Sequence, residues 1–203
     1  MSLVTLEIDG QQVVADEGTT LLDAARSAGM LIPTLCYHPL VEPFGACRLC
    51  SVKITKRGRS KIVTACNYPV EEGLIVETMS PEIITIRKLL IEFLLARCPS
   101  VPIIRALAEE YGVKASRFPQ EAETCILCGL CARVCDECVG LNAINFASRG
   151  VDRRIEGPLE ESLGANLKEV CIGCGACVCL SHGHHQARGG LPEDQKYLPV
   201  PGG

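Results

Sequence analysis

The sequence lacks the features that would place it in a membrane, direct it across one, or bind it to nucleic acid. No apolar run reaches the roughly 18 residues that a membrane-spanning helix needs. The opening segment MSLVTLEIDG alternates like a strand and has neither the charged nor the apolar region of a signal peptide. The net charge is -4, and we interpret the one short basic run, KRGRSK at 56–61, as the solvated tip of a hairpin. These absences favour a soluble protein that is not a dedicated nucleic-acid binder.

The sequence also lacks the short motifs that bind nucleotides or supply a nucleophile. It contains no GxGxxG fingerprint, no Walker loop and no nucleophile motif. We therefore expect the chain itself to hold neither NAD nor flavin nor a substrate. Its 203 residues, 47% of them hydrophobic, allow one ordinary domain or two to three small ones.

Cysteine is abundant, with fourteen residues in the chain. So many cysteines indicate either a disulfide framework in an oxidising compartment or thiolate ligation of metal in a reducing one. Because the chain shows no signal peptide, we favour metal ligation and predict a cytoplasmic protein with reduced thiols.

The first 80 residues show the pattern of a small mixed sheet packed on one helix. Residues 3–8 and 11–15 alternate with period two on either side of the turn Asp9-Gly10, which predicts a hairpin. The following run, 17–30, is predicted to be a helix capped by Thr19 or Thr20 and stopped by Gly29. The segments SVKIT, KIVTA and LIVETM predict three further strands. Their order and size indicate a β-grasp module.

Two helices are predicted next. The first, 81–97, begins with proline, and the second, which starts at 101, ends at Gly112. Helical spacing in the first helix predicts a core-facing set of Ile84, Leu89, Leu90, Phe93 and Leu94. Beyond these helices the cysteines return in two dense runs, and the final segment is rich in Gly and Pro without periodicity.

The first cysteine group occurs as CYHPLVEPFGACRLCSVKI and, after a strand-sized gap, VTACNYP. Its members are Cys36, Cys47, Cys50 and Cys66. Four thiolates are what a 2Fe-2S cluster needs, and a glycine-containing loop lets backbone N–H groups approach the sulfurs. Structural zinc is the alternative, although the usual two-pair zinc arrangement is absent. His38 lies beside a ligand, and we predict a hydrogen-bonding or surface role for it rather than ligation.

At these residues, and above all at IPTLCYHPLVEPFGACRLC, the chain resembles a known group. The group comprises the diaphorase iron-sulfur subunit of NAD-linked hydrogenases, the large iron-sulfur subunit of respiratory complex I and iron-only hydrogenases. The resemblance implies an N-terminal 2Fe-2S domain. Members often carry a further four-iron motif of one histidine and three cysteines. Here that region holds only Cys98, so we expect that cluster to be absent and Cys98 to be a small buried thiol.

The second cysteine group repeats the spacing of bacterial ferredoxins. CILCGLCARVC has the full Cx2Cx2Cx3C spacing, and CIGCGAC repeats its first three positions. In two-cluster ferredoxins the fourth cysteine of one run ligates the other cluster. Applied to this chain, the ligand arrangement of two-cluster ferredoxins predicts one complete 4Fe-4S cluster on Cys171, Cys174, Cys177 and Cys135. A second 4Fe-4S cluster would use Cys125, Cys128, Cys131 and a ligand at position 181.

Position 181 is a serine followed by His182, where cysteine and proline are expected. Three explanations remain open. Another group could serve as the ligand, the candidates being Cys138, Cys179, Ser181 and His182. The second cluster could be lost or reduced to three irons. Finally, the chain from about residue 178 could reflect a shifted reading frame, which we favour because synonymous codons for Leu180 to Gly189 can spell Cys-Pro-Thr-Gly in another frame.

Together these patterns predict an α+β protein. We expect a β-grasp 2Fe-2S ferredoxin-type domain over 1–80, a helical connector over 81–122, a two-cluster 4Fe-4S ferredoxin-type domain over 123–181, and an unstructured tail over 182–203. The resemblance implies an electron-relay subunit between a flavin/NAD-binding partner and a hydrogenase, formate dehydrogenase or related reductase. A free soluble ferredoxin and a zinc-binding structural protein are the alternatives.

Overall fold

The computed structural model describes residues 2–157 and residue 176, and these form two packed units. Residues 2–35 and 47–123 belong to the first unit, and residues 36–46 and 124–157 belong to the second. None of the helices in this part of the chain is long and apolar enough to cross a membrane.

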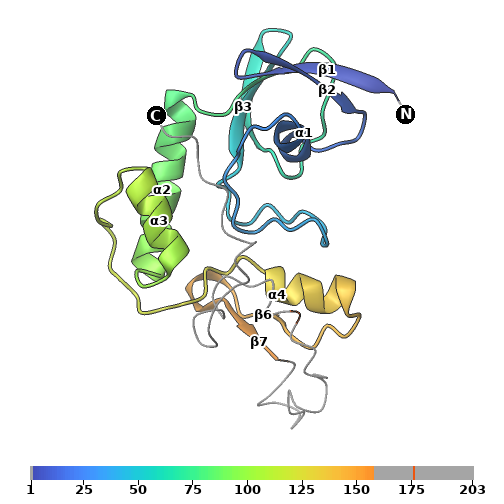
Figure 1. Cartoon of the computed structure of the whole chain (residues 1–203). Coiled ribbons are helices and arrows are strands. Elements are labelled where there is room, and N and C mark those ends of the chain that lie inside the picture. The colour runs from blue at the N-terminus through green and yellow to red at the C-terminus, as the bar shows by residue number, and fades with distance from the viewer. Residues whose placement is uncertain (1, 158–175, 177–203) are drawn as a thin grey trace. The chain divides into compact units, whose positions relative to one another are not determined.

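The N-terminal hairpin of the first unit forms as predicted. Strand β1 (Leu3–Ile8) pairs antiparallel with β2 (Gln11–Asp16) (Figure 1). Asp9 and Gly10 both have positive φ, at 49° and 84°, which matches the right-handed twist of the flanking strands. Side chains of β1 alternate between the buried and the half-exposed face, so the period-two pattern marks a strand with one buried side.

Helix α1 (Leu21–Ser27) lies against the sheet of this unit (Figure 1). Its apolar side chains Leu21, Leu22, Ala24 and Ala25 are buried in the core. Thr20 is the N-cap, and its side-chain oxygen accepts a hydrogen bond from Asp23 N at 3.1 Å. Gly29 follows the helix with φ 77° and ends it. The predicted cap and the predicted stop are therefore both confirmed, with Thr20 rather than Thr19 as the cap.

Five strands complete a mixed sheet in the order β2-β1-β5-β3-β4. The three later strands are β3 (Ser51–Lys56), β4 (Arg59–Thr64) and β5 (Ile75–Glu77). Only β1 and β5 run parallel among the pairs of this sheet. This topology with α1 across it confirms the β-grasp prediction and, more broadly, the α+β class.

Two details of the sheet differ from or add to the predicted pattern. Strand β5 covers only 75–77 of the predicted 74–79, because Thr78 turns to bond the hairpin. Thr78 N and Oγ1 both donate to the Asp9 carboxylate, with Thr78 N at 2.7 Å. The basic run at 56–61 is the β3–β4 hairpin tip, as predicted, with Arg57 and Gly58 in the turn.

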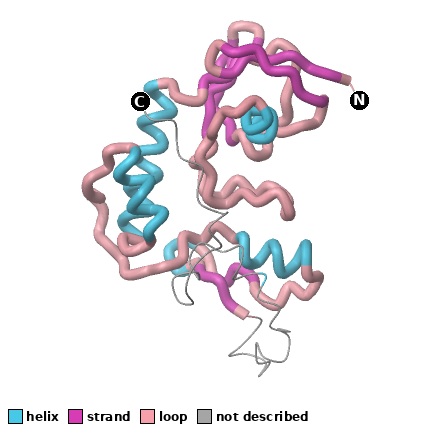
Figure 2. Tube along the Cα trace, in the orientation of Figure 1, coloured by secondary structure: helices cyan, strands magenta, loops and turns pink. Residues whose placement is uncertain are grey.

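A long loop joins α1 to β3. Between residues 28 and 50 the chain has neither helix nor strand (Figure 2). Three of the four cysteines of the first group lie in it, and the fourth follows β4. Strand β3 therefore fixes the C-terminal end of the loop that carries three of these cysteines, and β4 fixes the start of the segment that carries Cys66.

Helix α2 (Pro81–Arg97) and helix α3 (Pro102–Glu110) pack against each other within the first unit. Ser80 caps α2 and Pro81 occupies its first turn, as expected for a helix start. After α3, Gly112 has φ 66° and ends the helix where the sequence predicted. Cys98 is fully buried, which confirms its prediction as a buried thiol.

The predicted apolar face of α2 is wrong. Leu89 and Phe93 are 39% and 47% exposed, whereas Arg87 and Glu92 are buried. Apolar residues lie on more than one side of this helix, so their spacing alone does not select the buried side. Contacts with β3 and α3 select the face that includes Ile83 instead.

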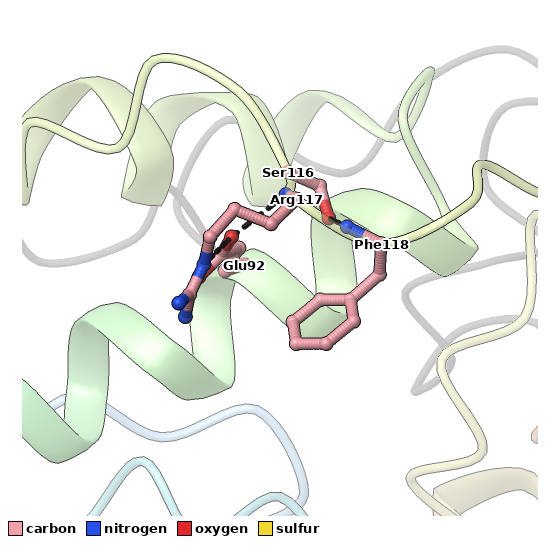
Figure 3. A network of polar contacts seen from close by, with 4 residues as sticks. All are labelled: Glu92, Ser116, Arg117 and Phe118. Carbon is pink, nitrogen blue, oxygen red and sulfur yellow. Dashed lines mark hydrogen bonds and ion pairs between the residues drawn. The ribbon is translucent and has the colours of Figure 1, made fainter.

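An ion pair holds the segment after α3 to α2 (Figure 3). Both carboxylate oxygens of Glu92 accept hydrogen bonds from Arg117, at 2.8 Å from Nε and 2.9 Å from Nη2. Arg117 N adds a third bond at 2.7 Å. These hydrogen bonds lower the pKa of Glu92 below its ordinary value. Phe118 stacks on Phe93 beside them.

The second unit contains short elements. Helix α4 (Leu130–Arg133) continues into a π-helical turn (Val134–Cys138), and β6 (Asn145–Ala147) pairs antiparallel with β7 (Arg154–Glu156). Within this unit Phe44 stacks on Phe146 with ring centroids 6.0 Å apart. The predicted tail, 182–203, and the predicted ligands Cys171, Cys174 and Cys177 lie outside the described residues.

Replacing Glu92 by Gln should lower the melting temperature of the protein by a few degrees at pH 7, because the Arg117 guanidinium loses its charged acceptor. The lowered pKa means that the ionised carboxylate adds stability above the ordinary Glu pKa of 4.5, and this contribution is lost as the pH falls through the folded-state value. Calorimetry at pH 7 and pH 3 should therefore show a difference between the two proteins that shrinks in acid.

Glu121→Gln is the matched control. Its side chain pairs with Arg97 but is 56% exposed, so the substitution should change the melting temperature little. An equal loss in both variants, or a Glu92 effect that persists at pH 3, would contradict the assignment.

Candidate iron-sulfur centres

Cys47 lies near the end of the loop between α1 and β3, in a part that belongs to the first unit, and a backbone amide faces its sulfur. Leu35 N donates a hydrogen bond to Cys47 Sγ at 3.4 Å. A backbone donor of this kind stabilises a thiolate ligand and tunes the potential of the cluster it binds. Arg48 follows with φ 60°, a left-handed conformation that turns the chain between Cys47 and Cys50.

Cys50 and Cys66 lie at the same end of the β3–β4 hairpin. Cys50 immediately precedes β3, Cys66 is the second residue after β4, and Ala65 N donates to Cys50 O at 3.0 Å. Both cysteines are only 1% exposed. The hairpin thus brings two predicted ligands, separated by fifteen intervening residues, to one end of the sheet.

Cys36 opens the segment 36–46, which belongs to the second unit. Arg133 donates to Cys36 O from Nη2 and to Glu42 O from Nη1. Glu42 N in turn donates to Glu137 Oε2 at 2.6 Å. This segment is therefore bound to the helical stretch that carries the second cysteine group.

His38, within the same segment, accepts a hydrogen bond at Nδ1 from Leu40 N at 3.2 Å. Burial and, to a smaller degree, the nearby Arg133 charge lower the pKa of His38. His38 therefore forms a hydrogen bond, as predicted, through Nδ1.

The first four cysteines of the second group lie in and before the helical stretch. Cys125 and Cys128 precede α4, Cys131 lies in it, and Cys135 lies in the π-helical turn. Ala143 N donates to Cys135 Sγ at 3.2 Å, as Leu35 N does to the sulfur in the first unit. Leu127 and Gly129 both have positive φ, so the backbone before α4 is left-handed at two positions.

Burial dominates the electrostatics of this run. It raises the pKa of the Cys128 thiol to about 11, with smaller opposing contributions from a backbone hydrogen bond and from Arg133. Metal binding requires the thiolate, so a bound cation must displace this proton. The predicted ligands Cys171, Cys174 and Cys177 lie outside the described residues.

The residues present suit an iron-sulfur cluster. The ten cysteines of the described part are thiols, and a backbone N–H is directed at a sulfur in each unit. No three His, Cys, Asp or Glu side chains within 2–157 and 176 are arranged to hold a single metal ion. The fit therefore rests on the thiol donors and their amide partners.

Residues 2–81 match the family described as "2Fe-2S iron-sulfur cluster binding domain". The gamma subunit of the NAD-reducing hydrogenase HoxS from Cupriavidus necator is 34% identical over 179 residues, covering 75% of each chain. The chain belongs to the family of this hydrogenase gamma subunit. The match to a 2Fe-2S domain supports a cluster over structural zinc in the first unit.

Two further comparisons extend the similarity. The crystal structure of an NAD+-reducing [NiFe]-hydrogenase in the H2-reduced state contains a chain that aligns with a TM-score of 0.71 and 30% identity, covering 84% of this chain and 80% of that one. The NADPH-Fe(3+) oxidoreductase subunit alpha of Geobacter sulfurreducens is 34% identical over 201 residues. This chain spans only 23% of that subunit's length.

Gly129 packs closely against an aromatic ring, which sequence reasoning did not reveal. A Cβ at this position would lie 2.9 Å from Phe146 Cζ, and φ there is 72°. Arg153 covers Phe146 at 3.8 Å and Phe44 stacks on it, so the ring has little freedom to move away.

We expect Gly129→Ala to lower the melting temperature and the iron content of anaerobically purified protein. The alanine Cβ would clash with the Phe146 ring. In addition, the left-handed backbone conformation costs a residue with a Cβ about 1 to 2 kcal/mol. Gly140→Ala is the control, because its φ is 73° and nothing lies within 4 Å of an added Cβ. Equal effects of the two substitutions would show that the contact with Phe146 is unimportant.

Proposed function

We propose that this protein is an electron-relay subunit of a multi-subunit oxidoreductase. The observation that carries the proposal is membership of the HoxS gamma family by a chain whose first unit is a 2Fe-2S-type β-grasp domain. One-electron transfer is the chemistry that such clusters supply when bound. The residues of this chain bind the clusters, exclude water from them and direct amide hydrogens at their sulfur ligands.

The proposed clusters follow the cysteine spacing. Four cysteines of the first group hold the 2Fe-2S cluster, namely Cys36, Cys47, Cys50 and Cys66. One 4Fe-4S cluster is bound by Cys135, Cys171, Cys174 and Cys177, and a second by Cys125, Cys128 and Cys131 with one further ligand. Support comes from burial of Cys36, Cys50, Cys66, Cys128 and Cys131, whose exposure is at most 7%.

The fourth ligand of the second 4Fe-4S cluster has four candidates. Cys138 is the one within the described residues, where it is exposed and its Sγ donates to Leu40 O at 3.3 Å. Cys179, Ser181 and His182 are the others. A shifted reading frame from about residue 178 stays part of this proposal, and resequencing the gene tests it directly.

The proposed partners are a flavin/NAD-binding subunit and a catalytic subunit such as a hydrogenase, formate dehydrogenase or related reductase. The names of the relatives, which include an NAD-reducing hydrogenase and an NADPH-Fe(3+) oxidoreductase, support this choice. A docked subunit is favoured over a free ferredoxin because α2 exposes Leu89 and Phe93. We place the protein in the cytoplasm, where thiols remain reduced.

Anaerobically purified protein should be brown and, after reduction, give a 2Fe-2S electron paramagnetic resonance signal that Cys50→Ala abolishes. Removing one of four thiolate ligands leaves the binuclear site incomplete. Cys98→Ala is the control: this thiol is equally buried but is not a proposed ligand, so the signal should persist. Stoichiometric zinc in place of iron would refute the cluster assignment.

The isolated chain should not oxidise NADH, because it carries no nucleotide-binding fingerprint. Adding a flavin-containing diaphorase subunit should allow NADH to reduce the clusters, which is followed as bleaching of their visible absorption. The Cys50→Ala variant should give a smaller absorbance change in the same mixture. Rapid NADH oxidation by the chain alone would argue against a relay.

A further inference from the structure

Helix α2 carries a cation into the core of the first unit. The Arg87 side chain is 0% exposed. Its Nε donates to Leu49 O and its Nη2 to Ser51 O, both at 3.0 Å. Leu49 and Ser51 are the residues on either side of Cys50, so one guanidinium holds the backbone on both sides of a proposed ligand.

The remaining guanidinium contacts are neutral. Nη1 lies 3.1 Å from Met79 Sδ and donates to Tyr111 Oη at 3.4 Å. No carboxylate within the described residues forms an ion pair with Arg87. Glu110 interacts with Arg87 electrostatically without an ion pair: burial raises the pKa of Glu110, and the Arg87 charge lowers it less strongly.

A buried charge without an ion-pair partner is unfavourable unless something compensates it. An apolar side chain of similar length would fill this site at less cost in desolvation. A 2Fe-2S site supplies the compensation, because two ferric ions, two sulfides and four thiolates together carry net negative charge. One-electron reduction adds a further negative charge, which a nearby buried cation favours.

We propose that Arg87 is a positioning residue that raises the reduction potential of the 2Fe-2S site by fixing the backbone around Cys50 and holding a buried positive charge beside it. This inference rests on the proposed function, since it takes Cys50 as a ligand. Arginine suits the role because its fork binds two carbonyls at once and it stays protonated at any physiological pH.

The test measures the potential of the 2Fe-2S signal by redox titration followed with electron paramagnetic resonance, on the full chain. Arg87→Met removes the charge and the hydrogen bonds but keeps the length. It should make the site at least tenfold harder to reduce, equal to about 59 mV for a one-electron couple. Arg87→Lys keeps the charge but loses the fork that binds two carbonyls, so its potential should lie between those of the wild type and Arg87→Met, and the line shape of the signal should change.

Lys88→Met is the matched control. It removes a cation from the adjacent, exposed position of the same helix, where water screens the charge, and should leave the potential unchanged. If the Met variant takes up no iron, Arg87→Gln is measured in its place. Failure of both neutral variants to hold the cluster, with Arg87→Lys still loaded, would support a requirement for the charge.

Several results would overturn the inference. A loaded Arg87→Met or Arg87→Gln protein with the wild-type potential would show that the residue only stabilises the fold, even if the melting temperature falls. Loss of the cluster in all three Arg87 variants, including Arg87→Lys, would also refute the role of the charge. Absence of a 2Fe-2S signal from the wild type itself would instead refute the proposed function.

Discussion

The hydrogen bonds from the Arg87 guanidinium to two backbone carbonyls connect the main parts of the first unit. They join α2 to the segment where the cysteine-bearing loop becomes strand β3. Because the cation is fully buried, its carbonyl partners cannot be replaced by water without opening the core. The same group therefore contacts the chain on both sides of Cys50 and the Tyr111 hydroxyl at the end of α3.

The second unit uses an arginine in a comparable way. Arg133 lies between the proposed ligands Cys131 and Cys135 and donates to backbone carbonyls of the 36–46 segment. Its Nε is buried without a hydrogen-bond partner in the described structure, and the guanidinium lies 5.5 Å from the centre of the Phe44 ring. In both units, therefore, an arginine on a helix binds backbone carbonyls of an irregular loop, in addition to the hydrogen bonds within that loop.

Backbone amides face sulfur in both units. Leu35 N and Ala143 N donate to Cys47 and Cys135, which belong to different cysteine groups. An amide aimed at a thiolate ligand lowers the cost of its negative charge and favours reduction of the cluster. The short irregular segments on which these residues lie supply such amides because their N–H groups are not committed to a helix or a sheet ladder.

The sequence alone predicts the strands of the first unit, the helix ends and the grouping of the cysteines, because these depend on local periodicity, caps such as Thr20, and spacing, but it did not predict the short strands β6 and β7. It did not determine which side of α2 is buried, since apolar residues occur around that helix and only contacts with β3 and α3 select a face. The roles of Arg87 and Glu92 were likewise decided by the tertiary structure. A charged side chain enters a core only where distant partners satisfy it, here 38 residues away at Leu49 and 25 residues away at Arg117, and such pairings leave no local pattern in the chain.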